Sequence, residues 1–174
     1  MKLPVLFLTM LFWAATSAAQ PPCELKLKSA PLLLNLSIGA SPEDAQARLG
    51  ENLKIKIKKS GERTFFQNYI KKPAPESVRG VRAIYLRFYN RKLYQIEIFY
   101  EPRQDLPNLE ATVNVLSAQL DLSAADWETK NKRGQIKCGE TSLAADYVLN
   151  PRIELTDETI RAAIEKAREK DKKD

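Results

Sequence analysis

The chain has 174 residues, 44% of them apolar, with 28 basic and 22 acidic residues and a net charge of +6. This composition suits one domain or two small fused modules, and it excludes a disordered chain. The absence of histidine excludes Ser-His-Asp and Cys-His nucleophile systems and removes the main ligand of common zinc sites. No glycine belongs to a phosphate-binding loop, so we expect no cofactor and no metal.

The first nineteen residues have the layout of a secretory signal peptide. Lys2 precedes an apolar run from Val5 to Ala15, and the small residues Thr16 to Ala19 follow. A membrane-spanning helix needs about 20 apolar residues, roughly twice the length of this run. We therefore expect cleavage near Ala19 and a periplasmic or secreted protein with a net charge of +5 and no membrane span.

The two cysteines lie near opposite ends of the expected mature chain, at Cys23 and Cys138. In an exported protein such a pair indicates a structural disulfide. A reactive thiol is the alternative, but it would need a basic or histidine neighbour to lower its pKa. Lipid attachment to Cys23 is disfavoured because Gln20, Pro21 and Pro22 precede it, where a lipoprotein signal has a small residue.

The mature chain is expected to begin with an extended segment over residues 20–38, which includes the apolar run Leu32 to Leu36. A helix follows, with Ser41 as its N-cap, Pro42 at its first position and Gly50 at its end. Because this helix is short, it depends on packing against a sheet for its stability.

A strand is predicted at residues 53–58, where apolar and lysine side chains alternate strictly. The lysine side could bind an anion such as a nucleic acid or a lipid head group. We favour the alternative, an edge strand that its lysines protect against aggregation, because nucleic-acid sites also show arginine and aromatic residues among the charges. The lysines are Lys54, Lys56 and Lys58.

A second strand is predicted at residues 64–70, and the strongest hairpin at Val81 to Tyr100, with a turn around Asn90 to Lys92. One face of this hairpin is apolar, with Ile84, Leu86, Phe88, Ile96 and Ile98. The other face carries Tyr85, Arg87, Tyr89, Gln95, Glu97 and Phe99. Tyrosine and arginine among polar groups are typical of binding hot spots. This second face therefore either binds a partner or is covered by the second half of the chain.

The second half begins with a helix from Asn108 to about Gln119, after which Trp127 is expected to join the core. Short strands are predicted at residues 135–138, 142–149 and 152–155, and a closing helix is capped at Thr156 or Asp157 and frayed from Lys166 onward. The chain therefore divides into a signal peptide (1–19), a first helix-plus-sheet module (20–105), a second module fused to it (106–155), and a C-terminal helix with a charged tail (156–174).

The acidic residues supply no catalytic candidate. They are spread over helix starts and exposed strand positions, and no two of them form an evident acid and base pair. Examples are Glu43, Asp44, Glu97, Asp126 and Asp157.

The segment Leu36 to Gly50, LSIGASPEDAQARLG, resembles the LGMSPEEVRARLG element of BamE-like (SmpA/OmlA) exported envelope proteins. The resemblance implies a helical layer on an antiparallel sheet and a binding role without catalysis. Two successive rounds of this kind also resemble the β-lactamase inhibitor protein fold. The missing lipid-attachment cysteine separates this chain from the lipoproteins that assemble outer-membrane barrels.

The sequence thus predicts an α+β protein with two successive helix-plus-antiparallel-sheet rounds and helices packed on one sheet face. The function ranked first is a non-catalytic binding or envelope-associated module whose partner is another exported or envelope protein. Weak anion or nucleic-acid binding through the lysine strand ranks second, and a carboxylate-dependent hydrolase third. The expected binding residues are Tyr85, Arg87, Tyr89, Glu97 and Phe99.

Overall fold

The computed structural model of the protein describes residues 25, 30–50, 58–60, 63–70 and 76–170. The predicted α+β class is confirmed, because the chain forms both helices and strands and the strand pairs are antiparallel. The expected signal peptide, Cys23 and the lysines at 54 and 56 lie outside the described residues, and Lys58 is the first residue of strand β1.

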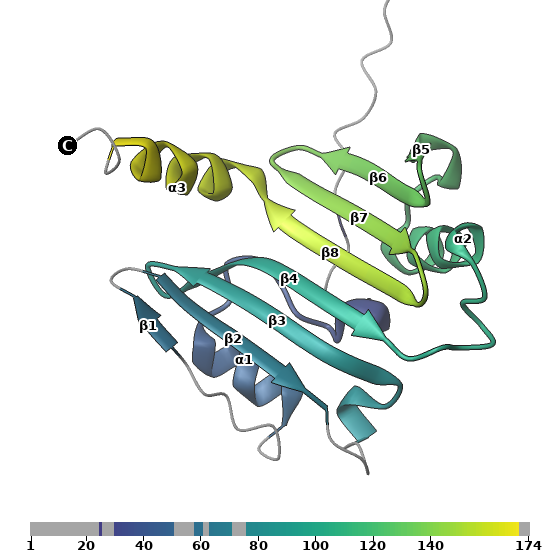
Figure 1. Ribbon diagram of the computed structural model, residues 1–174, viewed down its shortest axis with the longest axis horizontal. Coiled ribbons are helices and arrows are strands. Elements are labelled where there is room, and N and C mark those ends of the chain that lie inside the picture. The colour runs from purple at the N-terminus through teal and green to yellow at the C-terminus, as the bar shows by residue number, and fades with distance from the viewer. Residues whose placement is uncertain (1–24, 26–29, 51–57, 61–62, 71–75, 171–174) are drawn as a thin grey trace, which may run out of the picture.

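The described strands form one eight-stranded sheet in the order β1-β2-β3-β4-β8-β7-β6-β5 (Figure 1). The first four strands come from the first half of the chain and the last four from the second half. The two halves meet where β4 pairs with β8, with Ile98 opposite Ile153. The strands are β1 (Lys58–Ser60), β2 (Arg63–Tyr69), β3 (Val81–Tyr89), β4 (Lys92–Tyr100), β5 (Glu128–Lys130), β6 (Arg133–Cys138), β7 (Thr141–Tyr147) and β8 (Pro151–Asp157).

Helices α1 (Pro42–Leu49) and α2 (Leu109–Leu120) lie behind the sheet in Figure 1, one behind each half. Their apolar residues, such as Leu49 and Leu116, join one hydrophobic core with the inward residues of the strands, such as Leu86 and Leu155. The other helical elements of the described residues are the short turns η2 (Pro31–Leu33), η3 (Glu76–Val78) and η4 (Ala124–Asp126) and the C-terminal helix α3 (Glu158–Lys170). Among the described residues, no helix is long and apolar enough to span a membrane.

The helix starts follow from side-chain caps. Ser41 Oγ accepts from the amide of Asp44 at 3.1 Å, and the Asp44 carboxylate accepts in return from the Ser41 amide, which forms a capping box. Asn108 Oδ1 accepts from the amide of Ala111 at 2.8 Å at the start of α2. Both caps are those that the sequence predicts.

The β3–β4 hairpin closes through a two-residue turn at Asn90 and Arg91, whose φ angles are 48° and 61°. Positive φ at both positions is the type I′ geometry that matches the twist of a hairpin. The register then shifts within the hairpin, because Arg87 pairs with Gln95 while Phe88 pairs with Leu93. Tyr94 is thus the extra residue of a β-bulge, which bends the strand and increases its local twist.

The second round packs tightly through a glycine. A Cβ atom at Gly134 of β6 would lie 3.0 Å from Val113 Cγ2 of α2 and 3.3 Å from Trp127 Cε3. Trp127 itself is buried and donates from Nε1 to Ser117 Oγ at 2.9 Å. The helix approaches β6 this closely because residue 134 has no side chain.

Several expected elements are corrected by the structure. The segment that was expected to be extended forms the η2 turn, and Leu34 and Asn35 follow it with φ of 55° and 52°. The strand expected at 142–149 ends at Tyr147. The closing helix, expected to fray from Lys166, continues to Lys170, supported by good helix formers and by ion pairs of Arg161 with Glu158 and Glu165. The short edge strand β5 was not expected.

Candidate functional site

The candidate site is the outer sheet face, defined as the side of β3, β4, β8, β7 and β6 opposite α1 and α2 (Figure 1). Residues directly opposite one another on paired strands point to the same side, so the register places this face in three rows. The first row is Ala83, Phe99, Arg152, Asp146 and Arg133. The second is Tyr85, Glu97, Glu154, Ala144 and Gln135. The third is Arg87, Gln95, Thr156, Ser142 and Lys137.

The second half of the chain extends this face and does not cover it. Strand β8 pairs edge to edge with β4, so that Arg152 stands beside Phe99 and Glu154 beside Glu97. The polar side of the hairpin thus continues across the junction, and its central residues Gln95, Glu97 and Glu154 are buried within the enlarged face. At the end of β8 the face is bounded by α3, where the Ser142 hydroxyl donates to the Glu158 carboxylate.

Two buried carboxylates lie at the centre of the face. Glu97 and Glu154 are Cα partners on adjacent strands, and both are 9% exposed. Like charges directly opposite each other destabilise a sheet. Arg152 offsets this repulsion, because its Nη2 donates to Glu97 Oε1 at 2.7 Å and to Glu154 Oε2 at 2.9 Å.

The ion-pair network continues on both sides of this centre. Arg87 bonds to Gln95 and lies 3.8 Å from Glu97, and Gln95 Nε2 donates to Glu154 Oε1 at 2.9 Å. On the other side, Arg133 Nη1 donates to Asp146 Oδ2 at 2.8 Å. The carboxylate side chains are thus less exposed than the arginines that pair with them. The side chains of Arg87, Arg152 and Arg133 are 42%, 32% and 38% exposed.

An aromatic pair lies beside the network. The rings of Tyr85 and Phe99 meet edge to face with centroids 5.2 Å apart, and the Arg152 guanidinium lies 5.4 Å from the Phe99 ring centre. Both rings are half-buried. Edge-to-face rings and a stacked guanidinium form a rigid, amphipathic surface, which can contact both the apolar and the polar groups of a partner.

The structure therefore brings together four of the five predicted binding residues, Tyr85, Arg87, Glu97 and Phe99. The fifth, Tyr89, is half-buried at the end of β3. Sequence reasoning missed the second-half members of the face, which are Arg133, Asp146, Arg152 and Glu154. Their signal was the alternation of polar and apolar residues in Arg152 to Thr156, but only the β4–β8 pairing shows which face they extend.

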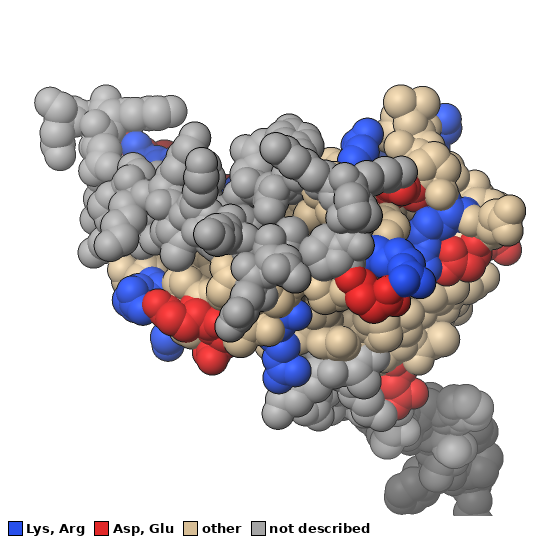
Figure 2. Space-filling view, turned by 90° about the horizontal axis from the view of Figure 1, so that it is seen from below, with Lys and Arg blue, Asp and Glu red and all other residues tan. Residues whose placement is uncertain are grey.

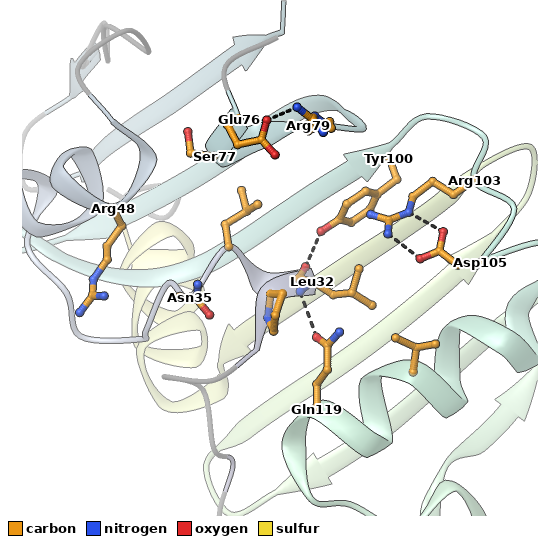
Figure 3. Close-up of a pocket in the computed structure, with 13 residues that line it drawn as sticks. Leu32, Asn35, Arg48, Glu76, Ser77, Arg79, Tyr100, Arg103, Asp105 and Gln119 are labelled. Carbon is orange, nitrogen blue, oxygen red and sulfur yellow. Dashed lines mark hydrogen bonds and ion pairs between the residues drawn. The ribbon is translucent and has the colours of Figure 1, made fainter.

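A separate cavity of about 340 Å³ lies on the helix side, where the two rounds meet (Figure 3). The Tyr100 hydroxyl donates to the Leu32 carbonyl at 2.7 Å, and the Leu32 amide donates to Gln119 Oε1 at 3.0 Å. Arg103 donates to both oxygens of Asp105, at 2.9 and 2.5 Å.

The charges in this cavity are largely paired. The hydrogen bond from Arg103 lowers the pKa of Asp105, and the same contact raises the pKa of Arg103. Glu76 is likewise paired with Arg79, and Arg48 points away from both pairs (Figure 3). Because the bonds at Tyr100, Leu32 and Gln119 join β4, η2 and α2, we interpret the cavity as a junction between the rounds.

The charged residues give no support to a nucleic-acid surface in the described part of the chain. On the face seen in Figure 2, described basic and acidic residues lie beside one another in mixed groups. On the outer sheet face, Arg87, Arg133 and Arg152 are paired with Glu97, Asp146 and Glu154, and Lys137 and Arg82 add two further basic residues. Within the described ranges, no group of three or more Cys, Asp or Glu side chains could hold a metal ion.

Comparison with known proteins identifies no relative: no family model, no curated protein and no solved structure matches the chain.

Proposed function

We propose that the protein is a non-catalytic, exported binding module that docks a protein partner on its outer sheet face. The observation that carries this proposal is the Tyr85–Phe99 ring pair beside partly exposed arginines, on a sheet side opposite both packing helices. Arginine and tyrosine are enriched at binding hot spots. The arginines are also held in place by the buried Glu97 and Glu154 and the half-buried Asp146, so they lose little conformational freedom on binding.

The electrostatic balance favours a protein over a polyanion as the partner. Nucleic-acid surfaces carry a net excess of lysine and arginine that neutralises phosphates, whereas the three central arginines of this face, Arg87, Arg133 and Arg152, each have a carboxylate neighbour. Anion binding through the lysine strand remains the second candidate, but Lys54 and Lys56 lie outside the described residues and contribute no geometry to it.

A carboxylate-dependent hydrolase remains the third candidate. Glu97 and Glu154 are the adjacent carboxylates that this reading requires. However, Arg152 donates to both of them, and an acid and base pair needs two carboxyl groups in different environments. This arrangement favours a structural role for both residues.

Export and a Cys23–Cys138 disulfide belong to the same proposal. The layout of residues 1–19 supports export, as does the resemblance of Leu36 to Gly50 to an element of exported envelope proteins. Cys138 is 6% exposed at the end of β6, and a buried cysteine in an exported protein is typical of a structural bridge.

Site-specific photocrosslinking in the exporting cell tests the binding face. A benzophenone amino acid at position 85 or 99 should give a protein adduct of defined mass, because both positions lie on the outer sheet face. The matched control is the same amino acid at Asn114, an exposed position of α2 on the opposite side. Arg87→Ala, introduced beside the position-99 probe, should reduce the adduct about tenfold or more, as expected for a hot-spot arginine.

Two results of the crosslinking experiment would contradict the proposal. Adduct formation from position 114 that matches or exceeds that from positions 85 and 99 would move the partner to the helix side. An adduct that excess unlabelled protein cannot suppress would show a non-specific contact.

A further inference from the structure

The turn between β7 and β8 exposes the two most solvent-accessible large apolar side chains in the described part of the chain. Val148 is 71% exposed and Leu149 is 85% exposed. They are adjacent in the sequence and follow Tyr147, the last residue of β7. Single exposed apolar residues are common on protein surfaces, but two neighbouring ones at the end of a hairpin form a compact apolar protrusion.

A second turn lies directly beside this one. The Tyr147 amide donates to the Lys132 carbonyl at 2.9 Å, which holds the β5–β6 turn against the β7–β8 turn at the same end of the sheet (Figure 1). Asn131 and Lys132 adopt positive φ in that turn, and Lys130 and Lys132 are both exposed. We call the Val148–Leu149 turn together with Lys130 and Lys132 the hairpin tip.

The arginines near the hairpin tip are paired with carboxylates, whereas no ion pair within the described residues involves Lys130 or Lys132. Arg133 is paired with Asp146, and Arg152 with Glu97 and Glu154. Three further acids near these turns are exposed: Glu128 at the start of β5, Asp126 in η4 before it, and Glu110 in the first turn of α2. Two lysines thus flank two aliphatic side chains.

From this arrangement we infer that the hairpin tip contacts an anionic lipid surface, with Val148 and Leu149 inserted among the lipids and the two lysines at the head groups. Aliphatic side chains gain free energy on leaving water, and lysines near an anionic leaflet are attracted to it. A protein partner fits this chemistry less well, because leucine and valine are under-represented among hot spots and lysine is depleted at protein interfaces. The contact is peripheral: Lys130 pairs with Arg133 at the rim of the outer sheet face, and Val148 and Leu149 lie outside its three rows.

Vesicle co-sedimentation of the protein, in the form that the expressing cell exports and processes, tests the inference. Vesicles of phosphatidylcholine with about one third phosphatidylglycerol should bind the protein, and vesicles of phosphatidylcholine alone should bind it at least tenfold more weakly. Val148→Ser with Leu149→Ser should weaken binding to the anionic vesicles about tenfold or more. Lys130→Gln with Lys132→Gln should weaken it to a similar extent and reduce its dependence on salt.

The matched control removes two exposed lysines away from the hairpin tip, Lys92 of β4 and Lys166 of α3, as Lys92→Gln with Lys166→Gln. It lowers the net charge equally and should retain most of the binding. If the control variant lost as much vesicle binding as the Lys130→Gln, Lys132→Gln variant, the binding would depend on net charge alone and the inference would be wrong. Equal binding to both kinds of vesicle, or no binding to the anionic vesicles, would also overturn it. If the protein bound no vesicles but formed a crosslinked adduct with another protein, and the Val148→Ser, Leu149→Ser variant lost that adduct, the partner of the hairpin tip would be a protein and not a lipid surface. Unchanged melting temperatures would confirm that the variants are folded.

Discussion

At the scale of single residues, one buried hydroxyl of the first round holds the η2 turn, whose Leu32 amide in turn donates to Gln119 of the second round. Tyr100 is 1% exposed, and its hydroxyl donates to the Leu32 carbonyl at 2.7 Å. Burial raises the pKa of Tyr100 above its ordinary value of 10, because the charged phenolate would lose its hydration inside the protein. The neutral phenol is therefore the form that stabilises the fold.

We predict that Tyr100→Phe lowers the free energy of unfolding by about 1–3 kcal/mol at neutral pH, because the Leu32 carbonyl loses its buried donor. The pKa is raised in the folded state, so the contribution of the hydroxyl is complete below pH 10 and decreases as the pH rises above 10. The difference between the wild type and Tyr100→Phe should therefore narrow above pH 10.

Urea unfolding at several pH values measures this difference, with Tyr147→Phe as the control at a half-buried tyrosine. A difference that stays constant or widens with rising pH would contradict the assignment of the Tyr100 hydroxyl as a buried neutral donor.

At the scale of elements, local signals in the sequence predicted the helices and the hairpin well. Ser41 and Asn108 are the caps expected from their side chains, and the turn at Asn90 closes the hairpin. Each of these features depends on a few neighbouring residues, which the sequence shows directly.

Elements that depend on distant contacts were not predictable in this way. The η2 turn is held by Tyr100 and Gln119, which are 68 and 87 residues from Leu32. Strand β5 has three exposed residues and exists through its pairing with β6. The candidate site was half predicted for the same reason: the hairpin supplied its first-half residues, and the pairing of β4 with β8 supplied the rest.

The capping box gives the prediction at this scale. Ser41→Ala should lower the free energy of unfolding by about 1 kcal/mol, as loss of an N-cap does. The hydrogen bond from Ser41 lowers the pKa of Asp44 below its ordinary value of 3.8, so the variant should raise that pKa. A carboxyl group whose pKa is lowered in the folded state stabilises the fold fully at pH values above its pKa in the unfolded chain. This contribution is lost as the pH falls toward the pKa of the folded state.

Measured by urea unfolding, the difference between the wild type and Ser41→Ala should therefore be full above pH 3.8 and shrink below it. The control is Ser123→Ala, the same change at the start of η4, a three-residue turn with no buried residue. An equal loss in the control would mean that the Ser41 effect does not arise from holding α1 against the core.

At the scale of the whole molecule, the two rounds form one structural unit. The sheet is continuous through β4 and β8, and residues of both rounds belong to one hydrophobic core. Opening either round would expose apolar residues of the other, such as Ile98 or Ile153, which are both fully buried. A shared core of this kind favours all-or-none unfolding.

We predict a single thermal transition in which the calorimetric and van't Hoff enthalpies agree. Leu49→Ala in the first round and Leu116→Ala in the second remove fully or almost fully buried side chains, and each should cost about 2–5 kcal/mol. If the rounds unfold together, each variant should shift the whole transition and leave no step at the original temperature. Two separate transitions, each moved by one variant alone, would contradict this coupling.

The proposed Cys23–Cys138 bridge adds a second test of the same coupling, because it would tie the start of the first round to β6 of the second. A loop of about 100 residues contributes up to about 4.7 kcal/mol in the chain-entropy model. Reduction should therefore add two hydrogen atoms to the mass and lower the melting temperature of the single transition, without splitting it. A Cys23→Ser, Cys138→Ser double variant should melt like the reduced protein and be insensitive to reductant. Two free thiols in the exported protein would remove the bridge and leave the continuous sheet and shared core as the links between the rounds.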